Sequence, residues 1–297
     1  MAKPFVKWAG GKRKLLPTLD QNLPKDLKKA QKVTYIEPFV GGGAMLFYML
    51  ECYPNIQRVI INDINPALIN CYRKIQQKHK ELIEELQALQ SEFYRTDDKE
   101  DWKSLYYERR KEYNNILPTK RNTLRAAALF IFFNKTCFNG LYRENNNGDF
   151  NVPFGRYVHP NICQEQCISE AHEALKTVEI LDGEYSNVLE LIDWDEYNFF
   201  YLDPPYRPLL GSNNFKQYTK NSFNDSEQEE LKSFCDTVNS KGGHFLLSNS
   251  DSEIASGENY FEKLYQGYTF QRIEAPRFIN AFAAKRSHVP EILIKNY

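Results

Sequence analysis

Four consecutive residues, Asp203-Pro204-Pro205-Tyr206, place a carboxylate, a rigid turn and an aromatic ring directly after the apolar run 199–202. The two prolines remove two N–H donors and restrict the backbone, so the Pro204 carbonyl can point beside the Asp203 carboxylate. Two adjacent acceptors suit the two hydrogens of one exocyclic amine, and the Tyr206 ring suits stacking on a planar base. Asp and Pro are also common where a strand merely ends in a turn. The pattern therefore predicts an amine-binding site, with a plain turn as the alternative.

The chemistry of such an amine explains why two acceptors would be needed. An exocyclic amine on a nucleobase is a poor nucleophile because its lone pair is delocalised into the ring. Two acceptors would draw the nitrogen toward tetrahedral geometry and stabilise the positive charge that develops as it attacks a methyl group. We therefore predict Asp203, Pro204 and Tyr206 as catalytic residues.

A glycine-rich turn, Gly41-Gly42-Gly43, follows a predicted strand at 33–37, and a second predicted strand at 58–62 ends in Asp63. Glycines at this position let the backbone approach a ligand, and the acid can accept hydrogen bonds from ribose hydroxyls. The spacing G-x-G-x-x-G is absent, which argues against a dinucleotide. The pattern predicts a nucleoside cofactor.

Two other chemistries lack the residues that they need. The segment GGK at 10–12 has neither the earlier glycine of a P-loop nor the Ser or Thr that would bind magnesium, since Arg13 stands there. No Pro-Cys dipeptide occurs, so the cysteine-nucleophile route of cytosine-C5 methylation has no candidate. An NTPase and a cytosine-C5 methyltransferase are both disfavoured.

The elements that must position these residues follow a strand–helix rhythm that a helical segment interrupts. Strand 33–37, helix 44–51, strand 58–62 and a helix capped by Asn65 and Pro66 form the opening of a parallel doubly wound sheet. Helical patterns fill about 70–135, including 99–115 and 123–133, and a loop follows at 139–160. Later strands are expected at 177–181, 198–202, 243–247 and 291–294, and a capping box from Ser226 to Glu229 predicts a helix at 227–239.

These patterns predict an α/β protein with a Rossmann-like doubly wound sheet and an inserted helical domain. The catalytic domain is expected to be discontinuous, at 1–72 and 168–297, and the insert to span 73–167. The net charge of 38 − 39 = −1 gives no global attraction to DNA, so a nucleic-acid surface needs locally clustered cations. No signal peptide or membrane span is visible, which favours a cytoplasmic protein without a membrane partner.

The cysteines predict reduced thiols in a packed core. Six are scattered through the chain without a Cys-x-x-Cys motif. His159, Cys163, Cys167 and His172 have roughly one-turn spacings, which leaves a zinc site as a minor alternative to ordinary packing. We predict no metal.

Three separated segments, FVKWAGGK at 5–12, EPFVGGG at 37–43 and Asp203 to Tyr206, together resemble the Dam-type DNA adenine-N6 methyltransferases of the D12 class, group alpha. The order of glycine motif, recognition insert and Asp-Pro-Pro-Tyr matches that group, and the resemblance runs from residue 5 to the C-terminal strand. It implies S-adenosyl-L-methionine as cofactor. The residues that would bind it are Trp8, Lys12, Glu37, Phe39, Gly41, Asp63 and Asp203.

The segments 134–143 and 148–157 mix rings, amides and cations, which suits a DNA groove. Arg143 could donate twice to a guanine edge, Leu141 and Pro153 could contact a thymine methyl, and Phe138 could fill the gap left by a flipped base. A packed hairpin with a solvated arginine is the alternative. By resemblance, this hairpin reads GATC through Lys7, Leu141, Arg143, Pro153 and Tyr157, with Phe138 and Asn139 at the intercalating site.

The C-terminal region departs from the resemblance. Family members often carry an Asn-Gly turn near basic residues, whereas this chain has RFINAFAAKR at 277–286, in which Lys285 and Arg286 could hold phosphates. The resemblance further implies double-stranded DNA as partner, a monomer, and a cognate restriction endonuclease acting separately.

The sequence thus predicts methyl transfer to N6 of a flipped adenine in duplex DNA, within GATC. One rival class is a methyltransferase-like protein that binds DNA without turnover, against which the intact Asp203, Asp63 and Trp8 argue. Amine methylation on RNA or protein fits the same chemistry. Cytosine-N4 enzymes commonly present Ser where Asp203 stands.

Overall fold

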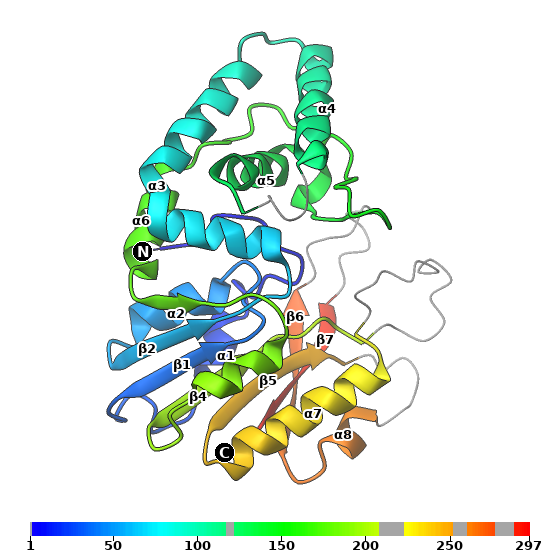
Figure 1. The fold of residues 1–297 in the computed structure, drawn as a ribbon. Coiled ribbons are helices and arrows are strands. Elements are labelled where there is room, and N and C mark those ends of the chain that lie inside the picture. The colour runs from blue at the N-terminus through cyan, green and yellow to red at the C-terminus, as the bar shows by residue number, and fades with distance from the viewer. Residues whose placement is uncertain (1, 117–121, 208–222, 252–259, 277–287) are drawn as a thin grey trace. The chain divides into compact units, whose positions relative to one another are not determined.

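The computed structural model describes residues 2–116, 122–207, 223–251, 260–276 and 288–297. Within these ranges a seven-stranded sheet has the order β3-β2-β1-β4-β5-β7-β6 (Figure 1). Strand β1 runs parallel to β2 and β4, and β4 parallel to β5, whereas β7 is antiparallel to β5 and β6. The strands are β1 Val33–Glu37, β2 Ile56–Ile61, β3 Val178–Ile180, β4 Tyr197–Leu202, β5 His244–Ser250, β6 Thr269–Pro276 and β7 His288–Lys295.

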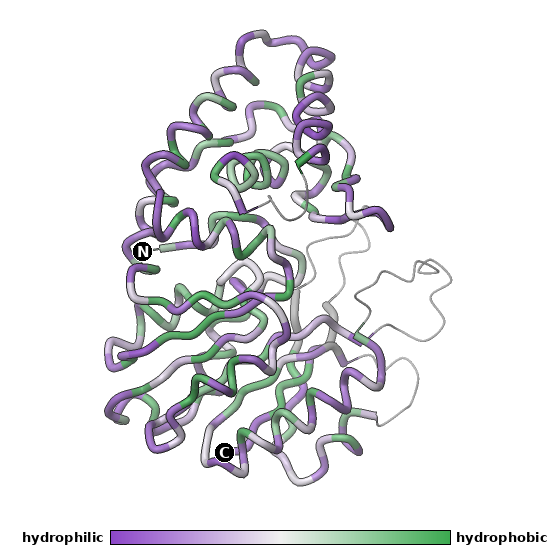
Figure 2. The backbone as a smooth tube through the Cα atoms, in the orientation of Figure 1, coloured by the Kyte–Doolittle hydropathy of each residue, from purple (hydrophilic) through white to green (hydrophobic). Residues whose placement is uncertain are grey.

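The central strands are apolar on both faces, as parallel strands covered on both sides must be. Every residue of β1 is buried, and so are the last five residues of β4. Figure 2 shows these strands as largely hydrophobic. The strand order runs outward in both directions from β1 and β4, which is the doubly wound arrangement. The predicted Rossmann-like methyltransferase fold is confirmed.

The helices agree with the periodicity of the sequence over most of their length. Asn65 caps α3 as predicted, since its side chain accepts from the N–H groups of Ala67 and Leu68. The long α3 is kinked at Lys78, whose backbone is not helical. The helices are α1 Leu16–Gln21, α2 Ala44–Cys52, α3 Pro66–Phe93, α4 Lys99–Asn115, α5 Leu124–Thr136, α6 Glu165–Leu175, α7 Asp225–Ser240 and α8 Tyr260–Leu264.

One predicted cap was wrong by two residues. The capping box of α7 joins Asn224 and Glu227, not Ser226 and Glu229. The Asn224 side chain accepts from the N–H groups of Ser226 and Glu227, and the Glu227 carboxylate accepts from the Asn224 N–H. Asn is at least as good an N-cap as Ser, so the upstream box with the same spacing starts the helix earlier.

The chain divides into two compact units. The first comprises Met1–Lys12, Val40–Cys52 and Asn62–Glu184, and the second comprises Arg13–Phe39, Tyr53–Ile61 and Tyr185–Tyr297. In the first unit α3 packs on α5 and α6, and α4 packs on α5. The second unit contains β1, β2 and β4 to β7, with α7 packed on β5. No helix in the described part of the chain is long and apolar enough to cross a membrane.

Candidate functional site

Two predicted carboxylates lie where β1 and β4 end side by side in the second unit. Ile36 of β1 pairs with Phe200 of β4, so both carboxyl ends reach the same edge of the sheet. Glu37 is the last residue of β1, and Asp203 directly follows β4. The strand order reverses between β1 and β4, and ligands of doubly wound sheets bind at such a switch point.

The Asp203 carboxylate is half-buried and held by a neighbouring strand. Ser248 Oγ donates to Asp203 Oδ1 at 3.3 Å. Pro204 is buried and Pro205 is exposed, so the turn leaves the sheet directly after Asp203. This environment keeps an acceptor at the strand end in a fixed place.

The Tyr206 hydroxyl lies in a largely buried and acidic environment. Burial, with Asp203 and Glu291 nearby, raises the pKa of Tyr206, so the phenol keeps its proton and remains a donor. The next residue, Arg207, pairs with Asp225 at 2.7 Å, which fixes the end of the tetrapeptide.

Glu37 and Phe39 border the same end of β1. Glu37 is only 2% exposed and accepts from the Tyr35 hydroxyl at 2.7 Å. The Phe39 ring packs on Tyr185 and Phe223, with ring centres 5.0 and 6.2 Å away. A carboxylate and an aromatic ring therefore lie at the carboxyl end of β1.

The glycine turn is built in the first unit around Asp63. Its Oδ2 accepts from the Gly41 N–H and its Oδ1 from the Asn65 N–H, both at 2.9 Å. Burial raises the pKa of Asp63, and these two backbone hydrogen bonds oppose that rise. Each carboxylate oxygen has a second lone pair, so the acid can hold the turn and still accept another hydrogen bond.

The Trp8 indole lies against this turn. A Cβ added to Gly41 would come within 2.7 Å of Trp8 Cδ1, and the φ of +47° at Gly41 disfavours other residues as well. The Trp8 ring also stacks with Phe130, with ring centres 6.4 Å apart. Lys12, another predicted cofactor residue of this unit, is only 4% exposed. The first unit thus gathers a bare backbone turn, an aromatic ring and a buried acid.

The predicted base readers Lys7 and Tyr157 come together in the first unit, although 150 residues separate them. The Lys7 Nζ lies 4.5 Å from the centre of the Tyr157 ring. Asn134 fixes the backbone beside them: it accepts from Lys7 N–H at 2.7 Å and donates to the Lys7 carbonyl at 2.7 Å and the Gly140 carbonyl at 2.9 Å. No pattern in the sequence predicted this role of Asn134.

The hairpin presents the other predicted readers at its surface. Phe138 is 44% exposed, and its N–H donates to the Pro153 carbonyl at 2.9 Å. Asn139 next to it adopts a left-handed backbone with φ of 56°, which Asn tolerates. Leu141 is half-buried. Arg143 is exposed, and its Nε donates to Asn151 Oδ1 at 2.7 Å. In the described part of the chain the two terminal nitrogens of Arg143 have no hydrogen-bond partner, so they can serve a DNA edge.

Other candidate residues remain from the sequence. Lys285 and Arg286 lie outside the described residues. Among the described residues no group of three or more His, Cys, Asp or Glu side chains could hold a metal. The four residues with one-turn spacing instead have separate surroundings, since the His172 ring stacks on His79 whereas the His159 ring packs near Tyr94.

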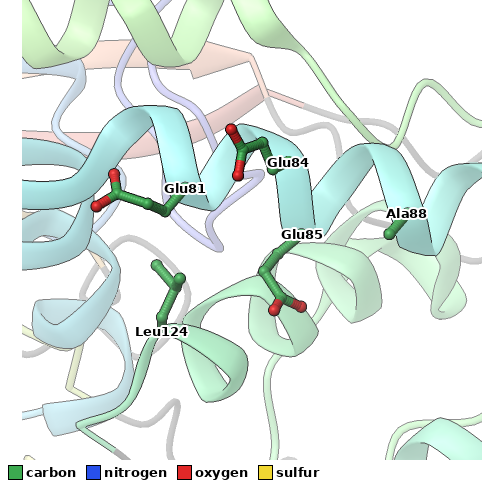
Figure 3. A pocket seen from close by; sticks show the side chains of 5 residues that line it. All are labelled: Glu81, Glu84, Glu85, Ala88 and Leu124. Atoms are coloured by element: carbon green, nitrogen blue, oxygen red, sulfur yellow. The ribbon is translucent and has the colours of Figure 1, made fainter.

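An acidic depression of about 250 Å³ lies on the first unit, and none of the residues that line it is a predicted site residue (Figure 3). Its charge would repel phosphate. Glu85 there pairs with Arg125 at 2.9 Å, which already gives that acid a structural role. The lining residues are Glu81, Glu84, Glu85, Ala88 and Leu124.

Ser248 is another residue of the site that was not predicted from the sequence. A signal existed for Ser248, because the polar run 248–251 follows an apolar strand at its carboxyl end, where ligands of parallel sheets bind. Its role depends on pairing between distant strands.

Comparisons with known proteins agree over almost the whole chain. A Type II methyltransferase, M.MjaIII of Methanocaldococcus jannaschii, is 44% identical over 99% of both chains. Another, M1.LlaDCHI of Lactococcus lactis subsp. cremoris, is 34% identical over 99% of this chain and 95% of that one. A DNA adenine methylase of Haemophilus influenzae is 30% identical over 98% and 92%.

A family model described as D12 class N6 adenine-specific DNA methyltransferase matches residues 8–279. This span includes the glycine turn, the hairpin and the tetrapeptide Asp203 to Tyr206. The predicted resemblance and the predicted enzyme class are therefore confirmed. The chain belongs to the D12 class of N6 adenine-specific DNA methyltransferases.

Proposed function

We propose that this enzyme transfers a methyl group from S-adenosyl-L-methionine to N6 of an adenine that is flipped out of duplex DNA, within the sequence GATC. The observation that carries the proposal is the position of Asp203, which follows β4 at the switch point of the sheet and is held there by Ser248. Family membership supplies the adenine amine as the group that this carboxylate would face.

S-adenosyl-L-methionine fits the residues of the glycine turn. A Cβ on Gly41 would collide with the Trp8 indole, so glycine keeps that ring against the turn, and Asp63 is a buried acid that can accept from ribose hydroxyls. When bound, this cofactor supplies an electrophilic methyl group on a sulfonium. We assign its binding to Trp8, Lys12, Gly41 and Asp63, and the resemblance to the family adds Glu37, Phe39 and Asp203.

The chain's own contribution to methyl transfer is to hold the amine and stabilise the charge that it develops. The Asp203 carboxylate and the Pro204 carbonyl would each accept one hydrogen bond from the amine, and the Tyr206 ring would stack on the flipped base. The amine nitrogen would take the methyl group in a single displacement, in which the carbon–sulfur bond of the sulfonium breaks and a neutral thioether leaves. The excess proton on the nitrogen would then pass to bulk water. No covalent enzyme intermediate forms.

DNA recognition is assigned to residues of the insert 73–167 together with Lys7. Exposed Arg143 has terminal nitrogens available for a guanine edge, and Leu141 and Pro153 supply apolar contacts to a thymine methyl. Phe138 and Asn139 would fill the space left by the flipped adenine. The choice of GATC is supported by the resemblance to the Dam group.

The test is methyl transfer from tritiated S-adenosyl-L-methionine into three unmethylated duplexes. One contains GATC, a second has its adenine replaced, and a third is mixed genomic DNA. Label confined to GATC and recovered as N6-methyladenine would support the reaction and the target. Label in genomic DNA alone would overturn GATC, and label in no duplex would overturn the proposed turnover on DNA.

A further inference from the structure

The amide of Asn134 forms three hydrogen bonds to backbone groups of two segments that lie far apart in the sequence. Asn134 belongs to the last turn of α5 and is only 3% exposed. Its Oδ1 accepts from the Lys7 N–H at 2.7 Å, and its Nδ2 donates to the Lys7 carbonyl at 2.7 Å and to the Gly140 carbonyl at 2.9 Å. One side chain therefore binds both backbone groups of Lys7 and ties that residue to the hairpin.

The chemistry of these three partners specifies a carboxamide. One backbone N–H needs an acceptor, and two carbonyls each need a donor. A carboxamide supplies an acceptor oxygen and two donor hydrogens in a single planar group. An ionised Asp of nearly the same size would keep the acceptor but would place a second acceptor against both carbonyls. Asn134→Asp is therefore a nearly isosteric change that removes two of the three hydrogen bonds.

The side chain of Lys7 is directed by the hairpin as well. Gly140 has a φ of +65°, and a Cβ added to it would lie 2.9 Å from Lys7 Cβ and 2.7 Å from Lys7 Cδ. The aliphatic stem of Lys7 thus packs directly on the Gly140 backbone. Beyond this contact the Lys7 Nζ lies 4.5 Å from the centre of the Tyr157 ring, which is a cation–π distance. The backbone, the stem and the ammonium of this exposed lysine are each held in place.

The Tyr157 ring is held by residues at the end of α5. The Gly155 N–H donates to the Thr136 carbonyl at 2.8 Å. A Cβ added to Gly155 would lie 2.7 Å from Tyr157 Cε2 and 2.5 Å from the Cys137 carbonyl oxygen. The end of the hairpin therefore packs closely on the backbone that follows Asn134. The same end of α5 thus supports both members of the cation–π pair.

We propose that Asn134 is a specificity-determining positioning residue, which fixes the place from which the Lys7 ammonium reads a guanine edge. This proposal rests on the proposed function, which assigns Lys7 to DNA recognition. Asn134 is buried and acts only through the Lys7 backbone. Lysine is a flexible point charge, and a lysine that is free to move would bind phosphate as readily as guanine. Its hydrogen bonds to guanine discriminate between bases only when its position is fixed.

The experiment measures kcat/KM for methyl transfer at saturating cofactor, on GATC and on duplexes altered at one base pair at a time. The enzymes are the wild type, Lys7→Ala, Asn134→Asp and the double variant. Discrimination at a base pair is the ratio of kcat/KM for GATC to kcat/KM for the altered duplex. This ratio does not depend on the fraction of enzyme that is folded, so a loss of stability alone leaves it unchanged. The base pair at which Lys7→Ala loses discrimination identifies the pair that Lys7 reads.

Two further variants separate positioning from stability. Asn70→Ala is the matched control, because Asn70 is a 4% exposed amide of the same unit that donates to the Thr123 carbonyl at 2.9 Å. Gly140→Ala displaces the Lys7 stem and leaves the Asn134 amide unchanged. It is the variant that decides if Asn134→Asp does not fold. The free energy of unfolding in urea is measured for each variant.

We expect Lys7→Ala to lower discrimination at one base pair by about tenfold, and Asn134→Asp to lower it at the same pair by at least about fivefold. Discrimination at the other pairs should stay within about twofold. The double variant should lose no more discrimination than Lys7→Ala, because both changes act on one contact. Gly140→Ala should relax the same pair, and Asn70→Ala should keep every ratio even where it lowers stability.

Two results would overturn the proposal. One is wild-type discrimination at the Lys7 pair in Asn134→Asp, or in Gly140→Ala if Asn134→Asp does not fold. The other is an equal loss at every base pair, which a purely structural role would give. Lys7→Ala separates this failure from that of the proposed function. If it relaxes one pair and Asn134→Asp relaxes none, only the positioning role is wrong, whereas unchanged discrimination in Lys7→Ala contradicts the assignment of Lys7 to DNA recognition.

Discussion

Asp63 Oδ2 accepts a 2.9 Å hydrogen bond from the Gly41 N–H, which joins the end of one strand to the turn after another. The same carboxylate accepts from the Asn65 N–H and so also holds the start of α3. Loss of this acid would release the turn against which Trp8 lies. A residue predicted to bind ribose thus also builds the surface on which the cofactor would rest.

Replacing Asp63 should weaken cofactor binding as well as folding. Asp63→Ala removes the acceptor for two backbone N–H groups, and each unsatisfied group costs about 1–3 kcal/mol. We expect the dissociation constant for S-adenosyl-L-methionine to rise at least about tenfold by isothermal titration calorimetry. Asp101→Ala on the exposed start of α4 is the control and should bind normally. Unchanged affinity in Asp63→Ala would remove Asp63 from the cofactor site.

Arg143→Ala should relax the discrimination of one base pair. A bidentate contact to guanine contributes about 1–3 kcal/mol, so the preference at that pair should fall about tenfold or more. The measurement is kcat/KM on GATC and on duplexes altered at each flanking position. Arg95→Ala is the control, because Arg95 is also exposed and its loss changes the charge equally. Full discrimination in Arg143→Ala would contradict the reader assignment.

Phe138→Ala should impair base flipping while leaving the Asp203 site intact. The exposed ring would no longer fill the gap in the stack, so the extruded state should become less stable. Fluorescence of 2-aminopurine at the target position should rise less on binding than with the wild-type enzyme. Tyr107→Ala, which removes a 36% exposed ring from α4, should give the wild-type signal. An equal rise in Phe138→Ala would show that this ring is not the wedge.

Lys135 should make stability depend on pH. Burial lowers its pKa from 10.5 to about 8, and its Nζ donates to the Phe5 carbonyl at 2.6 Å. Between these two pKa values the unfolded chain binds more protons than the folded chain, so this group's contribution to stability rises with pH. The free energy of unfolding, relative to Lys135→Met, should rise by about 2 kcal/mol between about pH 7.5 and about pH 10. A constant difference would show that the pKa of Lys135 is the same in the folded and the unfolded chain.

Local signals in the sequence sufficed for the parallel strands and most of the long helices. The cap at Asn65, the helix Lys99–Asn115 and the strand before Asp203 were predicted closely because each depends on its own residues. Strand β6 was not predicted, since TFQRIEAP mixes polar and apolar residues at the edge of the sheet. The short α1 and α8 give too little periodicity to detect.

The parts of the site that escaped prediction depend on contacts between distant segments. Asn134 acts on Lys7 across 127 positions, and Ser248 acts on Asp203 across 45. Asp203 and Tyr206 stood out because one short segment contains both. Strand pairing alone brings Ser248 beside them, and no local pattern specifies which residues will pair.

The most direct test of the whole account is the single-turnover rate of Asp203→Ala on a GATC duplex, measured with saturating S-adenosyl-L-methionine. The account predicts a rate lower by at least about a thousandfold, with DNA still bound, because the acceptor for the amine hydrogens is gone. N6-methyladenine formed at the wild-type rate would contradict the claim that Asp203 holds the amine.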